Sequence, residues 1–157
     1  MKYYLFRLVV FSFALFVCSC QHQEKPESAL FRDFNLGATV QQMNVAQLQP
    51  KTGGNSVSTS FGEITERRRD FILVYLLDEQ NTKDFDEATF LDNLRVQIAQ
   101  KISDAGLRTN LSRSYKDSFD FTYSEDESKG SIDVIGAKIE GNRYKLWCVM
   151  RESAVTK

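Results

Sequence analysis

Residues 84 to 107, DFDEATFLDNLRVQIAQKISDAGL, decide the fold of this chain. Their apolar side chains recur at intervals of three or four residues, the spacing of one face of an amphipathic helix. The residues on this face are Leu91, Leu94, Ile98, Ile102 and Ala105. The pattern predicts a helix over residues 86 to 105 with one buried stripe.

Sequence signals mark both the start and the end of this helix. Asp84 is a candidate N-cap, and Glu87 follows it at the spacing of a capping box. Gly106 suits the left-handed position that ends many helices. Leu107 is then placed to contact Ile102, which would complete a Schellman closure.

The segments around this helix have the character of strands. Residues 71 to 77, FILVYLL, are apolar at every position, which predicts a strand that is central in a sheet or covered on both faces. Residues 118 to 124, 131 to 139 and 143 to 151 come after the helix, and the first and last of them alternate in polarity. Short connections join these three, so we expect an antiparallel meander.

Together these elements predict an α+β two-layer sandwich. One main helix packs on an antiparallel sheet of about four strands, in the order strand-helix-strand-strand-strand. The position of residues 71 to 77 within the sheet stays open. Before them, residues 27 to 36 predict a short helix that Gly37 would end. Residues 38 to 48 predict an edge strand or an irregular wrap, and residues 49 to 60 a flexible loop.

The first twenty residues read MKYYLFRLVVFSFALFVCSC. Lys2 and Arg7 give a positive start, and an apolar run over residues 8 to 17 follows, broken only by Ser12. As a helix this run would extend roughly 15 Å, about half of a bilayer core. The layout is that of a secretory signal peptide.

Val17, Cys18, Ser19 and Cys20 end this segment. The four residues resemble the lipobox of bacterial lipoproteins. The resemblance implies that residues 1 to 20 form a lipoprotein signal, that Cys20 carries the lipid, and that the lipid anchors the chain to a membrane of the cell envelope. Gln21 after the cysteine implies the outer membrane in a Gram-negative cell. An ordinary cleaved signal and an uncleaved anchor are the alternatives.

Residues 21 to 30 are polar and predict a flexible tether, which leaves residues 31 to 157 as a single domain. Removal of the first twenty residues leaves 18 basic and 21 acidic side chains out of the 20 and 21 of the whole chain, because Lys2 and Arg7 are lost. A domain with a net acidic balance is not a general nucleic-acid binder. Cys148 is the one cysteine after Cys20, so no internal disulfide is expected and its thiol should be buried.

Residues for common catalytic and cofactor chemistry are scarce. The single histidine, His22, lies in the predicted tether, which disfavours Ser-His-Asp and Cys-His mechanisms and zinc sites. No glycine-rich phosphate loop occurs, and we predict no catalytic residue, cofactor or metal. Asp120 and Asp133, on neighbouring predicted strands, are the best carboxylate pair for acid–base chemistry, although acids on a sheet surface are common.

Two further charged groups have a simple interpretation. The acidic pair Asp126 and Glu127 lacks the spacing of a calcium loop, which favours a solvated hairpin end. The basic triplet at residues 67 to 69 is flanked by acids and favours a solvated surface.

Trp147 is the candidate partner surface, with a core tryptophan as the alternative. We therefore expect a non-catalytic envelope lipoprotein that binds another protein or helps a complex assemble. Two alternatives stay open: an envelope-anchored enzyme that uses carboxylates, and an immunity-type inhibitor of an envelope toxin.

Overall fold

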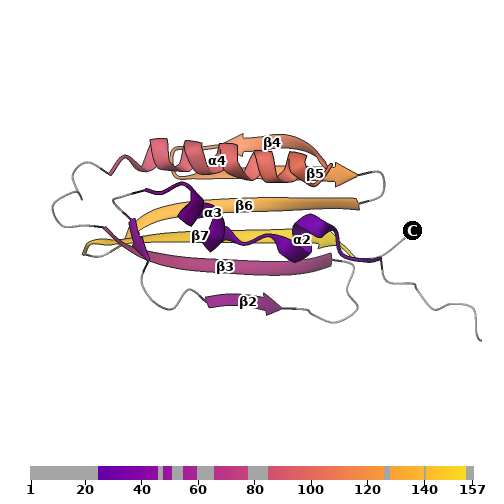
Figure 1. Ribbon diagram of the computed structural model, residues 1–157, viewed down its shortest axis with the longest axis horizontal. Coiled ribbons are helices and arrows are strands. Elements are labelled where there is room, and N and C mark those ends of the chain that lie inside the picture. Colours follow the sequence, from indigo (N-terminus) through magenta and orange to yellow (C-terminus); the bar gives the residue numbers. More distant parts are fainter. Residues whose placement is uncertain are drawn as a thin grey trace, which may run out of the picture.

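The computed structural model describes residues 25–45, 48–50, 55–59, 66–77, 85–125, 128–139 and 141–154 (Figure 1). These residues form an α+β fold with three helices: α2 (Ala29–Asp33), α3 (Leu36–Gln42) and α4 (Glu87–Asp104). The strands are β1 (Leu48–Pro50), β2 (Asn55–Thr59), β3 (Glu66–Leu77), β4 (Arg108–Ser114), β5 (Ser118–Glu125), β6 (Ser128–Ile139) and β7 (Arg143–Ser153). The predicted fold class is confirmed.

The sheet is antiparallel throughout, and its five long-paired strands follow the order β3-β7-β6-β5-β4. Two short strands, β1 and β2, pair with the outer edge of β3. The expectation of about four strands is wrong, because β4 was not anticipated. Its sequence, RTNLSRS, contains a single apolar residue, Leu111, and its pairing with β5 defines it instead.

The three helices lie on one face of the sheet. In Figure 1, α2 and α3 cross in front of the central strands, and α4 runs along β4 and β5. Residues of α2 contact β7, and residues of α4 contact β4 and β5. The described residues thus form two layers, as the amphipathic pattern of α4 requires.

The caps of α4 follow from its flanking sequence, with one correction. Asp86, not Asp84, is the N-cap: its carboxylate accepts from the backbone N–H of Ala88 at 3.1 Å. At the other end, Gly106 has φ of 76°. The N–H groups of Gly106 and Leu107 donate to the carbonyls of Ser103 and Ile102 at 2.9 and 3.1 Å, which is the predicted Schellman closure.

The helical region near the start of the domain differs from the prediction. Two helices occur, because Ser28 and Asn35 each cap one by accepting from the N–H three residues later, at 3.0 Å in both cases. Gly37 lies inside α3 and does not end a helix, contrary to the prediction. Part of the stretch predicted as a strand or wrap is therefore helical, and part of the predicted loop over residues 49 to 60 is strand.

Residues 25 to 30 lie within the predicted tether, and in the structure they lie against the sheet. The N–H of Lys25 donates to the carbonyl of Ala154 at 3.0 Å, and the N–H of Ser28 donates to the buried carboxylate of Glu152 at 3.1 Å. Arg67 donates to the carbonyl of Lys25. These bonds join the first described residues to the final strand.

The arginine triplet is not a uniform solvated surface. Successive side chains of β3 alternate between faces. Arg67 and Arg69 point toward the helices, where Arg69 donates to the carbonyl of Arg32 at 3.0 Å and lies 5.0 Å from the ring centre of Phe71. Arg68 points to the opposite face.

The core lies between α4 and the helix-covered face of the sheet. Apolar side chains with no exposed surface come from α3, α4, β6 and β7: Leu36, Leu94, Ile98, Ile102, Ile132, Val134, Tyr144, Leu146, Cys148 and Met150. Two glycines of β6 lie under tyrosine rings: Gly130 under Tyr123 and Gly136 under Tyr144. At both positions the ring occupies the space that a Cβ atom would need.

Buried tyrosines make the fold sensitive to high pH. Burial raises the pKa of Tyr75 to about 12, and it raises the pKa values of Tyr123 and Tyr144 in the same direction. In the unfolded chain tyrosines ionise near pH 10. Above that pH the unfolded state releases protons that the native state retains, so stability falls as pH rises, by about 1.4 kcal/mol per pH unit for each such group.

Urea unfolding at pH 8, 10 and 11 measures this loss. We expect the free energy of unfolding to fall between pH 10 and 11, and the fall to be smaller in Tyr75→Phe than in the wild type. A free energy of unfolding that is equal at pH 8 and pH 11 would contradict the burial of these phenols.

Candidate functional site

The face of the sheet opposite the helices carries the candidate site, and we call it the open face. It is formed by the even-numbered residues of β3 and the odd-numbered residues of β6 and β7, which alternate with the buried ones. No described element covers it. Ile72, Trp147 and Ile135 stand side by side across its three central strands, with exposed fractions of 38%, 38% and 45%. Trp147 is therefore a surface residue.

An apolar area extends along the open face from this row. We call it the open-face patch and define it by seven apolar residues around Lys145: Ile72, Val74, Leu76, Ile135, Ala137, Ile139 and Trp147. Arg143, the next residue of β7 on this face, stands between Leu76 and Ile139 at the edge of the patch. Lys145 pairs in register with Val74 on one side and Ala137 on the other, so its side chain stands at the centre. It forms no ion pair with any residue that the structure describes.

Trp147 lies beside an ion pair of β3. The guanidinium of Arg68 donates two hydrogen bonds of 2.9 Å to the two carboxylate oxygens of Asp70. The indole Nε1 of Trp147 donates to the same carboxylate at 3.4 Å. The bidentate geometry orients the Asp70 carboxylate. The indole makes one long hydrogen bond to it and keeps 38% of the Trp147 surface exposed.

The predicted carboxylate pair also lies on the open face. Asp120 of β5 and Asp133 of β6 are directly opposed in register. Each acid lies beside a basic residue: Asp133 accepts from Arg151 of β7, and Asp120 is paired in register with Arg113 of β4.

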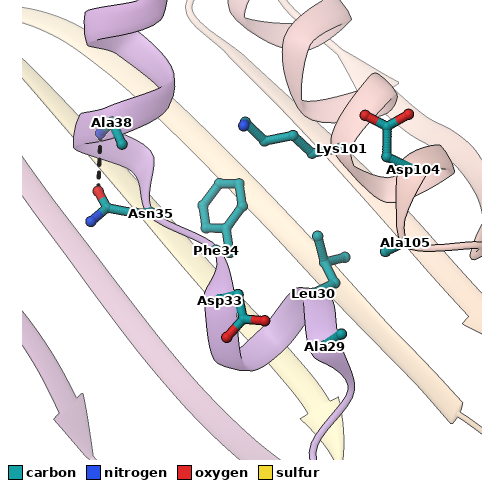
Figure 2. Close-up of a pocket in the computed structure, with 9 residues that line it drawn as sticks. All are labelled: Ala29, Leu30, Asp33, Phe34, Asn35, Ala38, Lys101, Asp104 and Ala105. Carbon is teal, nitrogen blue, oxygen red and sulfur yellow. Dashed lines mark hydrogen bonds between the residues drawn. The ribbon is translucent and has the colours of Figure 1, made fainter.

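Among the described residues, hollows lie in the helical layer and at one end of the sheet. One, of about 360 Å³, lies between α2, α3 and the end of α4 (Figure 2). Its polar side chains are engaged locally: Asn35 accepts from Ala38, and Asp104 accepts from Gln100 at 2.7 Å. Another, of about 490 Å³, lies where β3, β6 and β7 meet at one end of the sheet, between Glu66, Lys129 and Ser153.

The remaining predicted residues divide into two groups. Cys20, His22, Asp126 and Glu127 lie outside the described residues. Cys148 is fully buried, as predicted, and burial raises the pKa of its thiol. Among the residues described, no group of three or more His, Cys, Asp or Glu side chains is arranged to hold a metal ion.

The sequence located Trp147 but not the apolar residues beside it. The signal was present in residues 71 to 77, whose even positions are as apolar as their odd ones. Ile72, Val74 and Leu76 occupy those even positions. The neighbours of Trp147 became visible only once the structure placed β3 directly beside β7.

Comparison with known proteins adds no relative from which a role could be taken. In the described ranges, no helix combines the length and the apolar character needed to cross a membrane. No family model matches the sequence, no curated protein matches it, and no solved structure matches the fold.

Proposed function

We propose that the protein is a lipid-anchored component of a bacterial cell envelope, whose domain is a non-catalytic module that binds another protein or assists assembly. The observation that carries this proposal is the open-face patch. Its central row of Ile72, Trp147 and Ile135 leaves more than a third of each side chain exposed, although it lies in the middle of the sheet.

A flat apolar sheet face is ordinarily covered by a second layer, because burial removes its apolar surface from water. Among the residues that the structure describes, helices cover one face only. Tryptophan is enriched at the centres of protein interfaces, where it contributes a large and rigid contact area. A partner that covers the patch would supply the missing layer.

The anchoring part of the proposal depends on Cys20. Residues 17 to 20 resemble a lipobox, and the first described residue, Lys25, is bonded to Ala154 at the end of β7. Five residue steps separate Cys20 from Lys25 and extend at most about 17 Å. An acylated Cys20 would thus keep the domain close to the bilayer surface, where envelope partners are available at high local concentration.

Metabolic labelling with a fatty acid tests the anchor. We expect the wild-type chain to incorporate label and to fractionate with the envelope membranes, and we expect Cys20→Ser to lose both properties. Cys18→Ser is the matched control, because it changes the neighbouring thiol and should stay labelled. Label that persists in Cys20→Ser, or that disappears in Cys18→Ser alone, would contradict the assignment.

A further inference from the structure

Building on the proposed function, we propose that the open-face patch binds an acidic amphipathic segment of a partner protein, and that a carboxylate of this segment pairs with Lys145. The apolar side chains of the segment would cover Trp147 and the aliphatic residues beside it. The proposal specifies the chemistry of the partner, which the proposed function leaves open.

The positive charge of Lys145 at the centre of the patch indicates what kind of partner surface can cover it. Lys145 is flanked in register by Val74 and Ala137 at the centre of the seven apolar residues, and a second basic residue, Arg143, stands at the edge of the patch between Leu76 and Ile139. A partner that covered this area with a purely apolar surface would remove the ammonium group from water without compensation. A carboxylate placed opposite Lys145 offsets that cost and fixes the register of the complex.

A second copy of the chain is a poor occupant of the patch. A symmetric dimer that joined two open faces at their centres would bring the two Lys145 side chains together. Two ammonium groups in a dry interface repel each other strongly, since the low local dielectric increases their interaction. The position of Lys145 therefore disfavours self-association through this face.

A bilayer surface matches the patch less well than a protein does. The carboxylates of Asp70 and Asp133 adjoin it in the next row, on either side of Val149. Phosphate headgroups spread over a flat bilayer would meet these acids as well as Lys145 and Arg143. A folded segment can present one carboxylate to Lys145 and keep its other acids away from Asp70 and Asp133, so discrete complementarity favours a protein.

The single tryptophan of the chain provides the test, because its fluorescence reports on the patch alone. The probes are two synthetic amphipathic helical peptides with the same leucine face, one flanked by glutamates and the other by lysines. They are added to the native protein in nanodiscs of zwitterionic lipid. We expect a saturable blue shift of Trp147 with the glutamate peptide and none with the lysine peptide.

Charge reversal provides the matched variant. Lys145→Glu should weaken binding of the glutamate peptide by about tenfold or more and should confer binding of the lysine peptide. Val96→Glu is the control: this residue is 53% exposed on α4, on the helix side of the sheet, so the response should be unchanged. Circular dichroism of each variant confirms that it is folded.

Four results would overturn the proposal. One is an equal response to both peptides, and another is an unchanged response in Lys145→Glu. A concentration-dependent shift without peptide would identify a second copy as the occupant. Quenching of Trp147 by brominated lipid in the nanodiscs would identify the bilayer. If Cys20 carries no lipid, the same titration in buffer still decides the question, so the anchor and the docking surface fail separately.

Discussion

Replacement of Ile98 by alanine is expected to lower the free energy of unfolding by about 2–5 kcal/mol. Ile98 is fully buried on α4, where this helix packs on the sheet. Removal of its side-chain atoms loses their transfer free energy and leaves a cavity that the close-packed neighbours fill only in part. A domain of this size has a total stability of about 5–15 kcal/mol, so the variant should be close to unfolding.

Val96→Ala provides the matched control, because Val96 lies on the same helix with 53% of its surface exposed. Its replacement should change stability by less than about 0.5 kcal/mol. Urea denaturation followed by circular dichroism measures both variants. Similar losses at the two positions would mean that α4 does not pack on the sheet through the face that contains Ile98.

The second large effect is expected at Gly130. A Cβ atom at this position would overlap the ring of Tyr123 and the backbone carbonyl of Arg151. Neither group can move freely, since the Tyr123 hydroxyl donates to the same carbonyl at 3.3 Å and the ring is buried. Gly130→Ala should therefore destabilise the fold by about 1–3 kcal/mol or more, the usual cost of overpacking.

Gly37→Ala is the control, and we expect it to raise the stability that Gly130→Ala lowers. Gly37 lies inside α3, and the nearest atom to a new Cβ would be Asn35 Oδ1 at an ordinary contact distance of 3.4 Å. Alanine is favoured over glycine in a helix interior by about 1 kcal/mol. Thermal unfolding should thus shift upward for Gly37→Ala and downward for Gly130→Ala. A neutral Gly130→Ala would contradict the packing of Tyr123 over β6.

The sequence predicted those elements whose buried residues recur at the regular spacing of a helix or a strand. The stripe from Leu91 to Ile102 predicted α4, and the last three strands of the meander were found because short connections join them. β4 was missed since its residues are almost all exposed and its only apolar residue is Leu111. Pairing with β5 makes it a strand, and this non-local interaction leaves no period-two pattern of apolar residues.

The short helix predicted over residues 27 to 36 contains α2, whereas α3 was missed for a different reason. The caps Ser28 and Asn35 were present in the sequence, but Gly37 suggested an end where α3 in fact continues. Propensity is a weak guide when packing decides, and Leu36 and Val40 of α3 are buried. Tertiary contacts thus outweighed the local cost of glycine.

In the candidate site too, the local pattern was predictable and the non-local strand pairing was not. The alternation predicted over residues 143 to 151 implies that Lys145 and Trp147, two residues apart, share one face of the strand, and the structure places both on the open face. The sheet order was left open, and with it the identity of the residues beside them. Ile72 and Ile135 come from strands 63 residues apart in the sequence, and only their common neighbour β7 brings them into one row.

The most direct measurement for the whole account is the intact mass of the native protein purified from envelope membranes. We expect a chain that begins at Cys20 and carries the added mass of fatty acyl groups on this residue. A chain that begins at Met1, or one whose first residue has no acyl mass, would contradict it.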